Sequence, residues 1–302
     1  MGAVEQKSEL AAMTARRKIH DEKPKTKAPD MSDSTLSPTE HSGPYDALEK
    51  MTPREIVAAM NQLDRSVADA VGQAGKALAA LVEICTQKVA SGGRVFYLGA
   101  GTSGRLGVVD ASEIPPTFGV EDVFIGLIAG GDSAIRQAVE GAEDDAQGGI
   151  QDLEAAGAGP GDVVVGIAAS GRTPYVLGAV NWARAKGWAT GCITCHPQGA
   201  LAAAAQWPVV VDTGAEFLTG STRLKAGTAQ KLVLNTLSTG VMIGCGHVKG
   251  NKMVDMKLAN IKLLERAARM VIESTGCTAA QARAALEAHG SVRTAIANLN
   301  FS

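Results

Sequence analysis

Glycines and hydroxyl-bearing residues gather in one short segment, GAGTSGR at residues 99–105, which we call the first loop. It follows an apolar run at 95–98 and precedes a helical pattern. Backbone N–H groups at the start of a helix can bind an anion, and the helix dipole favours negative charge there. The hydroxyl groups of Thr102 and Ser103 add two donors that suit a terminal monophosphate. The first loop is therefore predicted to bind phosphate.

The same loop has a second interpretation. Gly99, Gly101 and Gly104 match the G-x-G-x-x-G fingerprint of dinucleotide-binding domains, and Asp132 follows the next apolar run, where an acid that binds ribose would lie. The fingerprint alone is a weak signal, and a plain glycine turn would show the same residues. The first loop by itself thus indicates an anion site without identifying the ligand.

A second loop of similar composition, Ser170 to Thr173, follows the apolar run 163–169. Two such loops after two strands of one sheet can converge on a single phosphate, and a dinucleotide domain does not need the second. We therefore expect Ser170, Arg172 and Thr173 to bind phosphate. Thr173 is also a good helix cap and Pro174 a good first-turn residue, so helix capping is an alternative role that is compatible with ligand binding.

A third segment, TGSTRLKAGT at residues 219–228, enters another helical pattern. Ser221 or Thr222 could cap that helix. Arg223 and Lys225 would then lie in its first turn, where cations oppose the helix dipole unless an anion is bound nearby. A solvated helix face is the alternative for either cation. We predict that Ser221, Thr222 and Lys225 contribute to the ligand site.

Two acids are candidates for proton transfer. Glu113 precedes the pair Pro115-Pro116, which forces the preceding helix to stop, and Glu143 lies in the acidic segment EGAEDD at residues 140–145. Chemistry on a sugar carbon needs a base and an acid flanking one bond. Sequence spacing does not show that the two glutamates converge, and a solvated surface is the ordinary place for a glutamate.

Short apolar runs alternate with helical segments through the middle of the chain. The runs show no apolar–polar alternation, which is typical of strands buried on both faces of a parallel sheet. The rhythm predicts an α/β doubly wound sheet, whose ligands bind beyond the carboxyl ends of the strands. The expected strands cover residues 95–98, 123–129, 163–169, 191–194 and 209–211, and a helix is expected at 174–186.

Three regions are predicted along the chain. Residues 1–44 are polar and proline-punctuated, which is typical of a disordered tail. Residues 45–250 would form the sheet domain, introduced by one helical pattern over 52–89 that Gly92 and Gly93 end. Residues 251–302 would form a small helical subdomain. The helices expected in the last hundred residues cover 222–243, 253–274, 278–289 and 291–298.

Composition excludes several classes of function. The chain has 302 residues, of which 45% are hydrophobic, which is enough for a large core. Its formal net charge of −2 gives no positive electrostatic potential that would attract nucleic acid or an anionic membrane. No apolar run approaches the roughly 20 residues that span a bilayer, and no secretory signal is recognisable. We therefore expect a cytoplasmic protein without nucleic-acid or membrane partners.

The five cysteines do not form a disulfide framework. Cys192 to His196 spells C-x-x-C-H, the pattern of c-type haem attachment, but it ends an expected buried strand in a chain without an export signal. Buried core cysteines are the favoured interpretation, and metal ligation is disfavoured because no second ligand pair lies nearby. His247, beside Gly246, is expected at a helix end and not as a catalyst.

Several long segments resemble the N-acetylmuramic acid 6-phosphate etherase family, a branch of the SIS (sugar isomerase) proteins that includes the glucokinase regulatory protein. The resemblance runs from about residue 39 to the C-terminal end. It is carried by residues 97–113, 126–131, 138–144, 162–175 and 219–239. It implies a five-stranded parallel SIS sheet, a homodimer with active sites near the subunit interface, and no metal or organic cofactor.

The resemblance also implies an activity, the removal of D-lactate from the sugar to leave N-acetylglucosamine 6-phosphate. In the family the glutamate of the Asp-Ala-Ser-Glu segment is the proton donor, which carries over to Glu113. The second catalytic glutamate carries over to Glu143, the expected base. Alternatives on the same fold are a sugar-phosphate isomerase, which needs no acid at carbon 3, and a non-catalytic sugar-phosphate sensor. A dinucleotide-dependent oxidoreductase is a more distant alternative.

Overall fold

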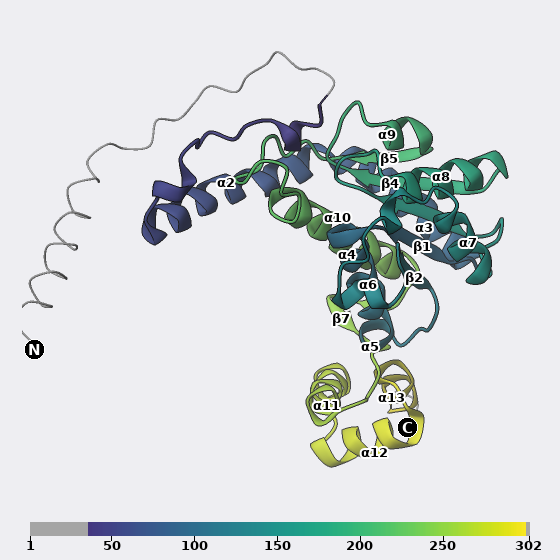
Figure 1. Cartoon of the computed structure of the whole chain (residues 1–302). Helices are drawn as coiled ribbons and strands as arrows, with labels where there is room; N and C mark the ends of the chain where they lie inside the picture. Colours follow the sequence, from purple (N-terminus) through teal and green to yellow (C-terminus); the bar gives the residue numbers. More distant parts are fainter. Residues whose placement is uncertain (1–35, 300–302) are drawn as a thin grey trace, which may run out of the picture.

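A five-stranded parallel sheet forms the centre of the molecule in the computed structural model, which describes residues 36–299 (Figure 1). Its strand order is β2-β1-β3-β4-β5, and every neighbouring pair is parallel. The predicted α/β doubly wound sheet is confirmed, and each expected strand overlaps an observed one. The strands are β1 (Val95–Gly99), β2 (Phe124–Ile128), β3 (Val163–Ile167), β4 (Ala189–Thr194) and β5 (Trp207–Val210).

Helices cover both faces of this sheet, which explains the continuous apolar runs. In β1, Val95 and Tyr97 belong to the core on one face, and Phe96 and Leu98 belong to the core on the other. The first face carries α3 (Gly75–Ala90), α4 (Gly101–Ser112), α5 (Ile114–Phe118) and α10 (Lys225–Gly244). The second carries α7 (Gly148–Ala155), α8 (Pro174–Ala185) and α9 (Ala200–Ala204). The short α6 (Ser133–Arg136) follows β2.

Glycines let α4 lie unusually close to the sheet. A Cβ atom added at Gly99 would lie 2.5 Å from the backbone nitrogen of Gly104, and one at Gly126 would lie 2.6 Å from the Cα of Val108. Any side chain at either position would push the helix away from β1 or β2. The first turn of α4 therefore sits directly over the end of β1.

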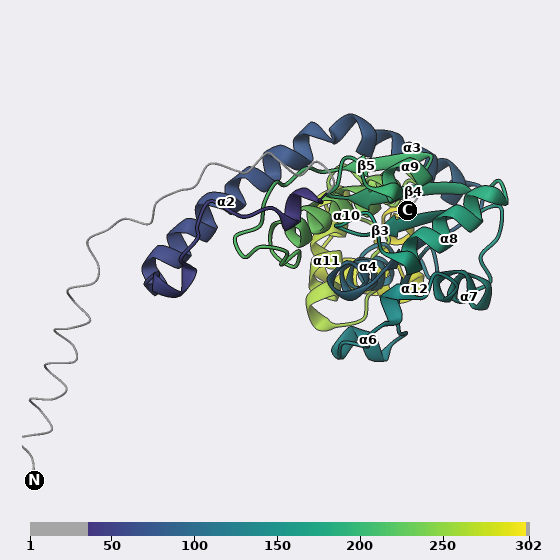
Figure 2. The same ribbon diagram turned by 45° about the horizontal axis from the view of Figure 1, so that its top comes forward.

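The helical pattern at 52–89 forms two helices, so the prediction of one continuous helix is wrong. Helix α2 (Pro53–Gln73) begins with a capping box between Thr52 and Glu55 and ends at Ala74, where ψ is 1° and α3 begins. Gly72 and Gly75 flank this break, and glycine weakens a helix. Figures 1 and 2 show α2 projecting away from the sheet.

The expected boundary of the disordered tail at residue 44 is wrong for residues 36–44, while residues 1–35 lie outside the described residues. Ser37 and Thr39 are fully buried, and η1 (Pro38–Glu40) begins between them. The backbone N–H of Gly220 donates to the carbonyl of Thr39 at 2.9 Å. This segment therefore packs on the third segment; η2 (Leu48–Lys50) follows it.

A buried carboxylate sets the start of α10. Glu216 is fully buried, and its two carboxylate oxygens accept the backbone N–H groups of Lys225 and Ala226, each at 2.9 Å. The helix therefore begins at Lys225, and the prediction that Ser221 or Thr222 caps a helix starting at 222 is wrong. The capping residue lies nine positions upstream, where a local pattern does not reveal it.

Three helices at the end of the chain form a unit with its own apolar core: α11 (Ile261–Thr275), α12 (Ala279–His289) and α13 (Val292–Leu299). Figure 1 shows this unit apart from the sheet, in yellow. Helix α11 starts eight residues later than expected, because a hairpin of β6 (Val248–Lys249) and β7 (Lys252–Met253) precedes it and Asn260 caps it. None of the helices within 36–299 has the length and apolar character needed to cross a membrane.

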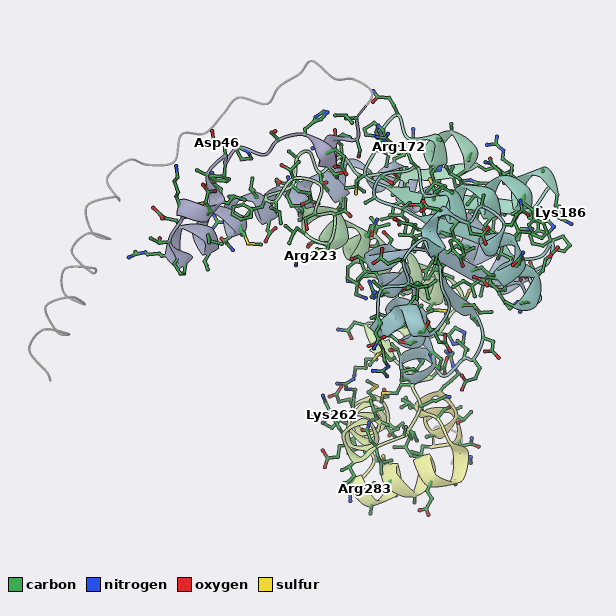
Figure 3. The ribbon with its side chains drawn as sticks, viewed as in Figure 1. Asp46, Arg172, Lys186, Arg223, Lys262 and Arg283 are labelled. Atoms are coloured by element: carbon green, nitrogen blue, oxygen red, sulfur yellow. The ribbon has the colours of Figure 1, made fainter. Side chains whose placement is uncertain are left out.

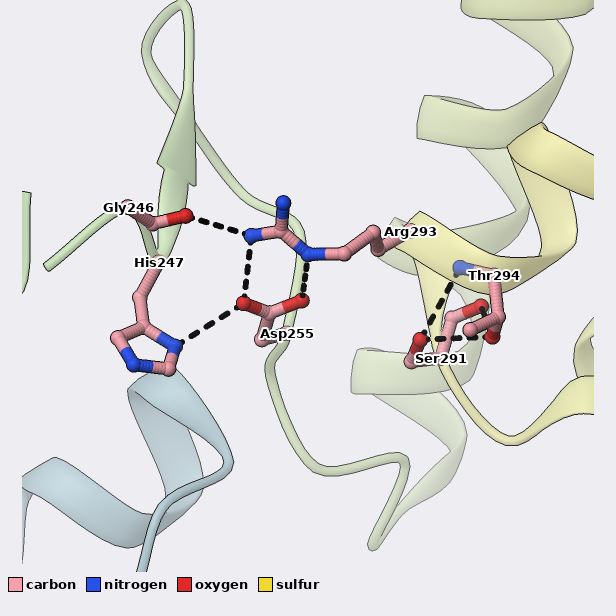
Figure 4. A network of polar contacts seen from close by, with 6 residues as sticks. All are labelled: Gly246, His247, Asp255, Ser291, Arg293 and Thr294. Carbon is pink, nitrogen blue, oxygen red and sulfur yellow. Dashed lines mark hydrogen bonds and ion pairs between the residues drawn. The ribbon is translucent and has the colours of Figure 1, made fainter.

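One carboxylate attaches this C-terminal unit to the rest of the molecule (Figure 4). Asp255 accepts two hydrogen bonds of 2.7 Å from the guanidinium of Arg293 on α13, and it lies 3.0 Å from Nδ1 of His247. Arg293 also donates to the carbonyl of Gly246 at 2.6 Å. His247 thus lies just beyond the end of α10, in a network that joins α10 to α13.

Acid should loosen this attachment. Burial raises the pKa of Asp255, but the hydrogen bonds and charges of Arg293 and His247 outweigh it and hold the pKa below the ordinary 3.8. A carboxyl group with a depressed pKa contributes stability above its unfolded-state value and loses it as the pH falls through the folded-state value. We expect amide protection factors in α11–α13 to fall as the pH drops below about 4. Asp255→Asn should weaken this pH dependence, and an equal dependence in both proteins would contradict the assignment.

Glu216→Gln should destabilise the sheet domain. The substitution places an amide NH₂ against one of two backbone N–H groups, so one buried donor loses its acceptor. The expected loss in the free energy of unfolding is about 1–3 kcal/mol, measured by urea denaturation. Glu154→Gln, on the exposed side of α7, is the matched control and should change the stability by less than about 0.5 kcal/mol. Equal stabilities of the two variants would refute the capping role.

Candidate functional site

The strand order places the first and second loops side by side. Strands β1 and β3 are neighbours, with Gly99 paired to Ile167 at their carboxyl ends. From β1 the chain crosses to β2 on one side, and from β3 it crosses to β4 on the other. Ligands of open α/β sheets bind in the crevice at such a reversal. The predicted phosphate loops therefore occupy the expected position.

In the first loop, Thr102 and Ser103 form the first turn of α4. Thr102 is half-buried. The hydroxyl of buried Ser103 donates to Oε1 of Gln230 on α10 at 2.9 Å. Its proton is therefore engaged in holding α4 to α10, and phosphate binding by Ser103 stays a prediction. The buried Nε2 of Gln230 has no hydrogen-bond partner among residues 36–299.

In the second loop, the Ser170 hydroxyl accepts the backbone N–H of Arg172 at 3.3 Å, and Arg172 itself is exposed (Figure 3). Thr173 occupies the capping position of α8, and Pro174 lies in its first turn. The predicted helix start is thus confirmed, although the Thr173 side chain makes no capping hydrogen bond within the described chain.

A histidine that sequence reasoning missed as a site residue holds this loop. Buried His196 places Nδ1 3.0 Å from the carbonyl oxygen of Ser170, and the N–H of Leu201 donates to the carbonyl of Gly171 at 3.0 Å. The loop after β3 is therefore fastened to the chain after β4. In the C-x-x-C-H segment, Cys192 and Cys195 are buried thiols, as expected, and burial raises the pKa of each to about 12.

The third segment approaches both loops. A Cβ atom at Gly227, in the first turn of α10, would lie 3.4 Å from the Thr102 side chain and 3.3 Å from the carbonyl of Thr222. Ala226 packs against Ala169, at the end of β3, in a small apolar cluster. Thr222 is thereby brought to the first loop. Ser221, half-buried, precedes it, and Arg223 is exposed (Figure 3).

The side chain of Lys225 points away from the first and second loops, toward the chain that follows β5. Its side chain is buried, and its ammonium donates to the carbonyl of Thr213 at 2.5 Å, on the chain that follows β5. Strand β5 lies two strands from β3, about 10 Å away. Burial lowers the pKa of Lys225, against the opposing charges of Glu216 and Asp212. Contact between Lys225 and phosphate stays a prediction that this geometry does not favour.

Glu143 lies beside the first loop. It belongs to η3 (Ala142–Asp144), is exposed, and lines a cavity of about 160 Å³ together with Gly101 and Arg105 at the start of α4. A carboxylate is thus close to the crevice that is suited to an anion. In this position it can act as a base on a carbon near a bound phosphate group.

Glu113 lies at the other end of α4. The helix ends at Ser112, as the proline pair predicts, and exposed Glu113 is its C-cap. Helix α5 begins at Ile114, with Pro115 and Pro116 in its first turn. Twelve residues at 1.5 Å each separate the two ends by about 18 Å. Within one chain, Glu113 therefore does not lie near Glu143 or the two loops.

Within residues 36–299, no group of three or more His, Cys, Asp or Glu side chains is arranged to hold a metal ion. The structure brings two loop–helix junctions and the exposed carboxylate of Glu143 to one edge of the sheet, and anion binding and proton transfer by these groups stay predictions. A second carboxylate is presented on the surface at the far end of α4.

Comparison with known proteins gives the context of this arrangement. A model of the glucokinase regulatory protein N-terminal SIS domain matches residues 77–184. An N-acetylmuramic acid 6-phosphate etherase from Christiangramia forsetii is 54% identical over 84% of this chain and 93% of its own length. An N-acetylmuramic acid 6-phosphate etherase from Bacteroides thetaiotaomicron is 52% identical over 85% of this chain and 94% of its own length.

Among solved structures, the phosphoheptose isomerase GmhA from Neisseria gonorrhoeae is 20% identical and aligns with a TM-score of 0.49 over 63% of this chain and 98% of its own. The high identity to the etherases extends over nearly their whole length. The chain belongs to the N-acetylmuramic acid 6-phosphate etherase family.

Proposed function

We propose that this protein is an N-acetylmuramic acid 6-phosphate etherase, a lyase that releases D-lactate and leaves N-acetylglucosamine 6-phosphate. The observation that carries the proposal is Glu143 beside the glycine-rich start of α4, in a chain that is 54% identical to an etherase over 84% of its length. The phosphate would bind at the starts of α4 and α8, where Thr102, Ser170 and Arg172 are grouped.

The chemistry follows from the open-chain form of the sugar. The aldehyde acidifies the proton on carbon 2, and Glu143 removes that proton. The bond between carbon 3 and the lactyl ether oxygen then breaks, and the carboxylic acid of Glu113 protonates the departing oxygen. Water adds across the resulting double bond, with its hydroxyl group on carbon 3 and a proton on carbon 2. Each step couples a proton transfer to the making or breaking of a bond to carbon, and none needs an oxidant or reductant.

In this proposal the working unit is a homodimer, in which Glu113 of one subunit serves the crevice of the other. Two observations support it. Glu113 lies about 18 Å along α4 from the start of that helix, beside which Glu143 of the same chain lies. The cavity beside Glu143 measures about 160 Å³, below the roughly 300–1,000 Å³ of ligand pockets, so a single chain encloses only part of a site. The exposed helix α2, with Val57 on its surface, offers further area for association.

Glu113→Gln and Glu143→Gln should each abolish most lactate release. Glutamine keeps the shape but neither accepts nor donates the required proton, so a loss of about 100-fold or more is expected. The measurement is an enzymatic D-lactate assay on N-acetylmuramic acid 6-phosphate, with Glu154→Gln as the control that keeps full activity. Wild-type protein that binds the sugar phosphate without releasing lactate would be a sensor, and aldose–ketose conversion would identify an isomerase.

A mixed dimer tests whether the two glutamates of one site come from different subunits. The two variants would be co-expressed with different affinity tags and purified through both. Each mixed dimer would then contain one site with both glutamates intact and one site with neither, so about half of the wild-type activity should return. A mixed dimer as inactive as its parents would show that each site uses both glutamates of one chain.

A further inference from the structure

The orientation of Glu113 depends on the short helix that follows it. The Glu113 N–H donates to the carbonyl of Asp110 at 3.2 Å, and its own carbonyl accepts the N–H of Thr117 at 3.3 Å. Its backbone thus joins the end of α4 to the first turn of α5. Any shift of α5 relative to the sheet therefore turns the Glu113 side chain.

The chain that leads to the C-terminal unit, residues 254–260, fixes α5 in place; we call it the strap. The Lys257 N–H donates to the carbonyl of Pro116 at 3.3 Å, and the Lys257 ammonium pairs with Glu121 just beyond α5. A Cβ atom at Gly119 would lie 2.0 Å from the carbonyl oxygen of Asp255. The strap and the end of α5 are thus in direct backbone contact.

The C-terminal unit in turn fixes the strap. Val254 and Met256 are buried in the core formed by α11–α13. Between them, the carboxylate of Asp255 is held by Arg293 of α13, and the Arg293 N–H donates to the carbonyl of Val254 at 3.1 Å (Figure 4). Residues 254–256 thus contact the unit through their side chains, while the carbonyl of Asp255 and residue Lys257 contact α5 and the chain just beyond it.

We infer that the C-terminal unit positions Glu113, with Arg293 and Asp255 as the positioning residues that act through the strap and α5. This inference rests on the proposed role of Glu113 as the proton donor. It gives the helical unit a part in the reaction although its helices lie at a distance from the crevice. A displaced strap would move the donor and leave Glu143 and the phosphate loops in place.

The test separates proton removal from ether cleavage in the full chain. Removal of the carbon-2 proton by Glu143 is followed as deuterium uptake from D₂O into recovered N-acetylmuramic acid 6-phosphate, and cleavage is followed as D-lactate release. Arg293→Ala should lower kcat for lactate release by at least about tenfold. It should leave KM within about twofold and retain deuterium uptake. Arg293→Lys, which keeps the charge, should recover part of the loss.

Arg283→Ala, on the exposed side of α12, is the matched control and should behave as wild type. Gly119→Ala disturbs the contact between the strap and α5 without touching the helical unit. It should therefore lower lactate release and retain deuterium uptake even if Arg293→Ala unfolds that unit. Lactate release at the wild-type rate in Arg293→Ala, or equal losses of uptake and release, would overturn the inference.

A readout that is independent of activity distinguishes this inference from the proposed function. Hydrogen exchange of residues 113–119 should rise in Arg293→Ala and stay unchanged in Arg283→Ala. Unchanged exchange in Arg293→Ala refutes the positioning role whatever the enzyme assay shows. Absence of lactate release by wild-type protein, by contrast, refutes the proposed function.

Discussion

Helix α4 can rest on the sheet only where side chains are missing, and this constraint arranges most of the molecule. Gly99 and Gly126 leave no room for a Cβ atom between the helix and strands β1 and β2. The helix is also tied to α10 near both ends, through Ser103 with Gln230 and through Asp110 with Lys231. A helix held in this way is rigid, so the first loop at its start and Glu113 at its end have fixed positions.

The sequence predicts the sheet well because the central strands carry their signal locally. β1 and β3 are buried along their whole length and are read as uninterrupted apolar runs. The helix starts at Gly101 and Pro174 are likewise local, since glycine and proline act on their own backbone. The strand order, which brings the two loops together, is a property of the whole sheet and cannot be read from either loop.

Where the predicted start of a helix is wrong, contacts with residues outside the local sequence pattern determine where the helix begins. The buried carboxylate of Glu216 starts α10 three residues after the expected position, and the strap delays α11 by eight residues. At the site, the ammonium of Lys225 is bound by Thr213 in a neighbouring loop, and its contact with phosphate stays a prediction. The position of Glu113 relative to Glu143 depends on how α4 lies on the sheet, which sequence spacing does not show.

The length of α4 fixes both the distance and the rotation of Glu113 relative to the first loop. Each residue of an α-helix advances the chain by 1.5 Å and turns it by about 100°, so one residue inserted between Gly101 and Ser112 would rotate Glu113 to another side of the molecule. In the proposed dimer, a Glu113 carboxylate that serves the crevice of the other subunit tolerates no such rotation. Length changes in homologues should therefore be absent from this helix and from residues 119–121, which contact the strap, and confined to surface turns elsewhere.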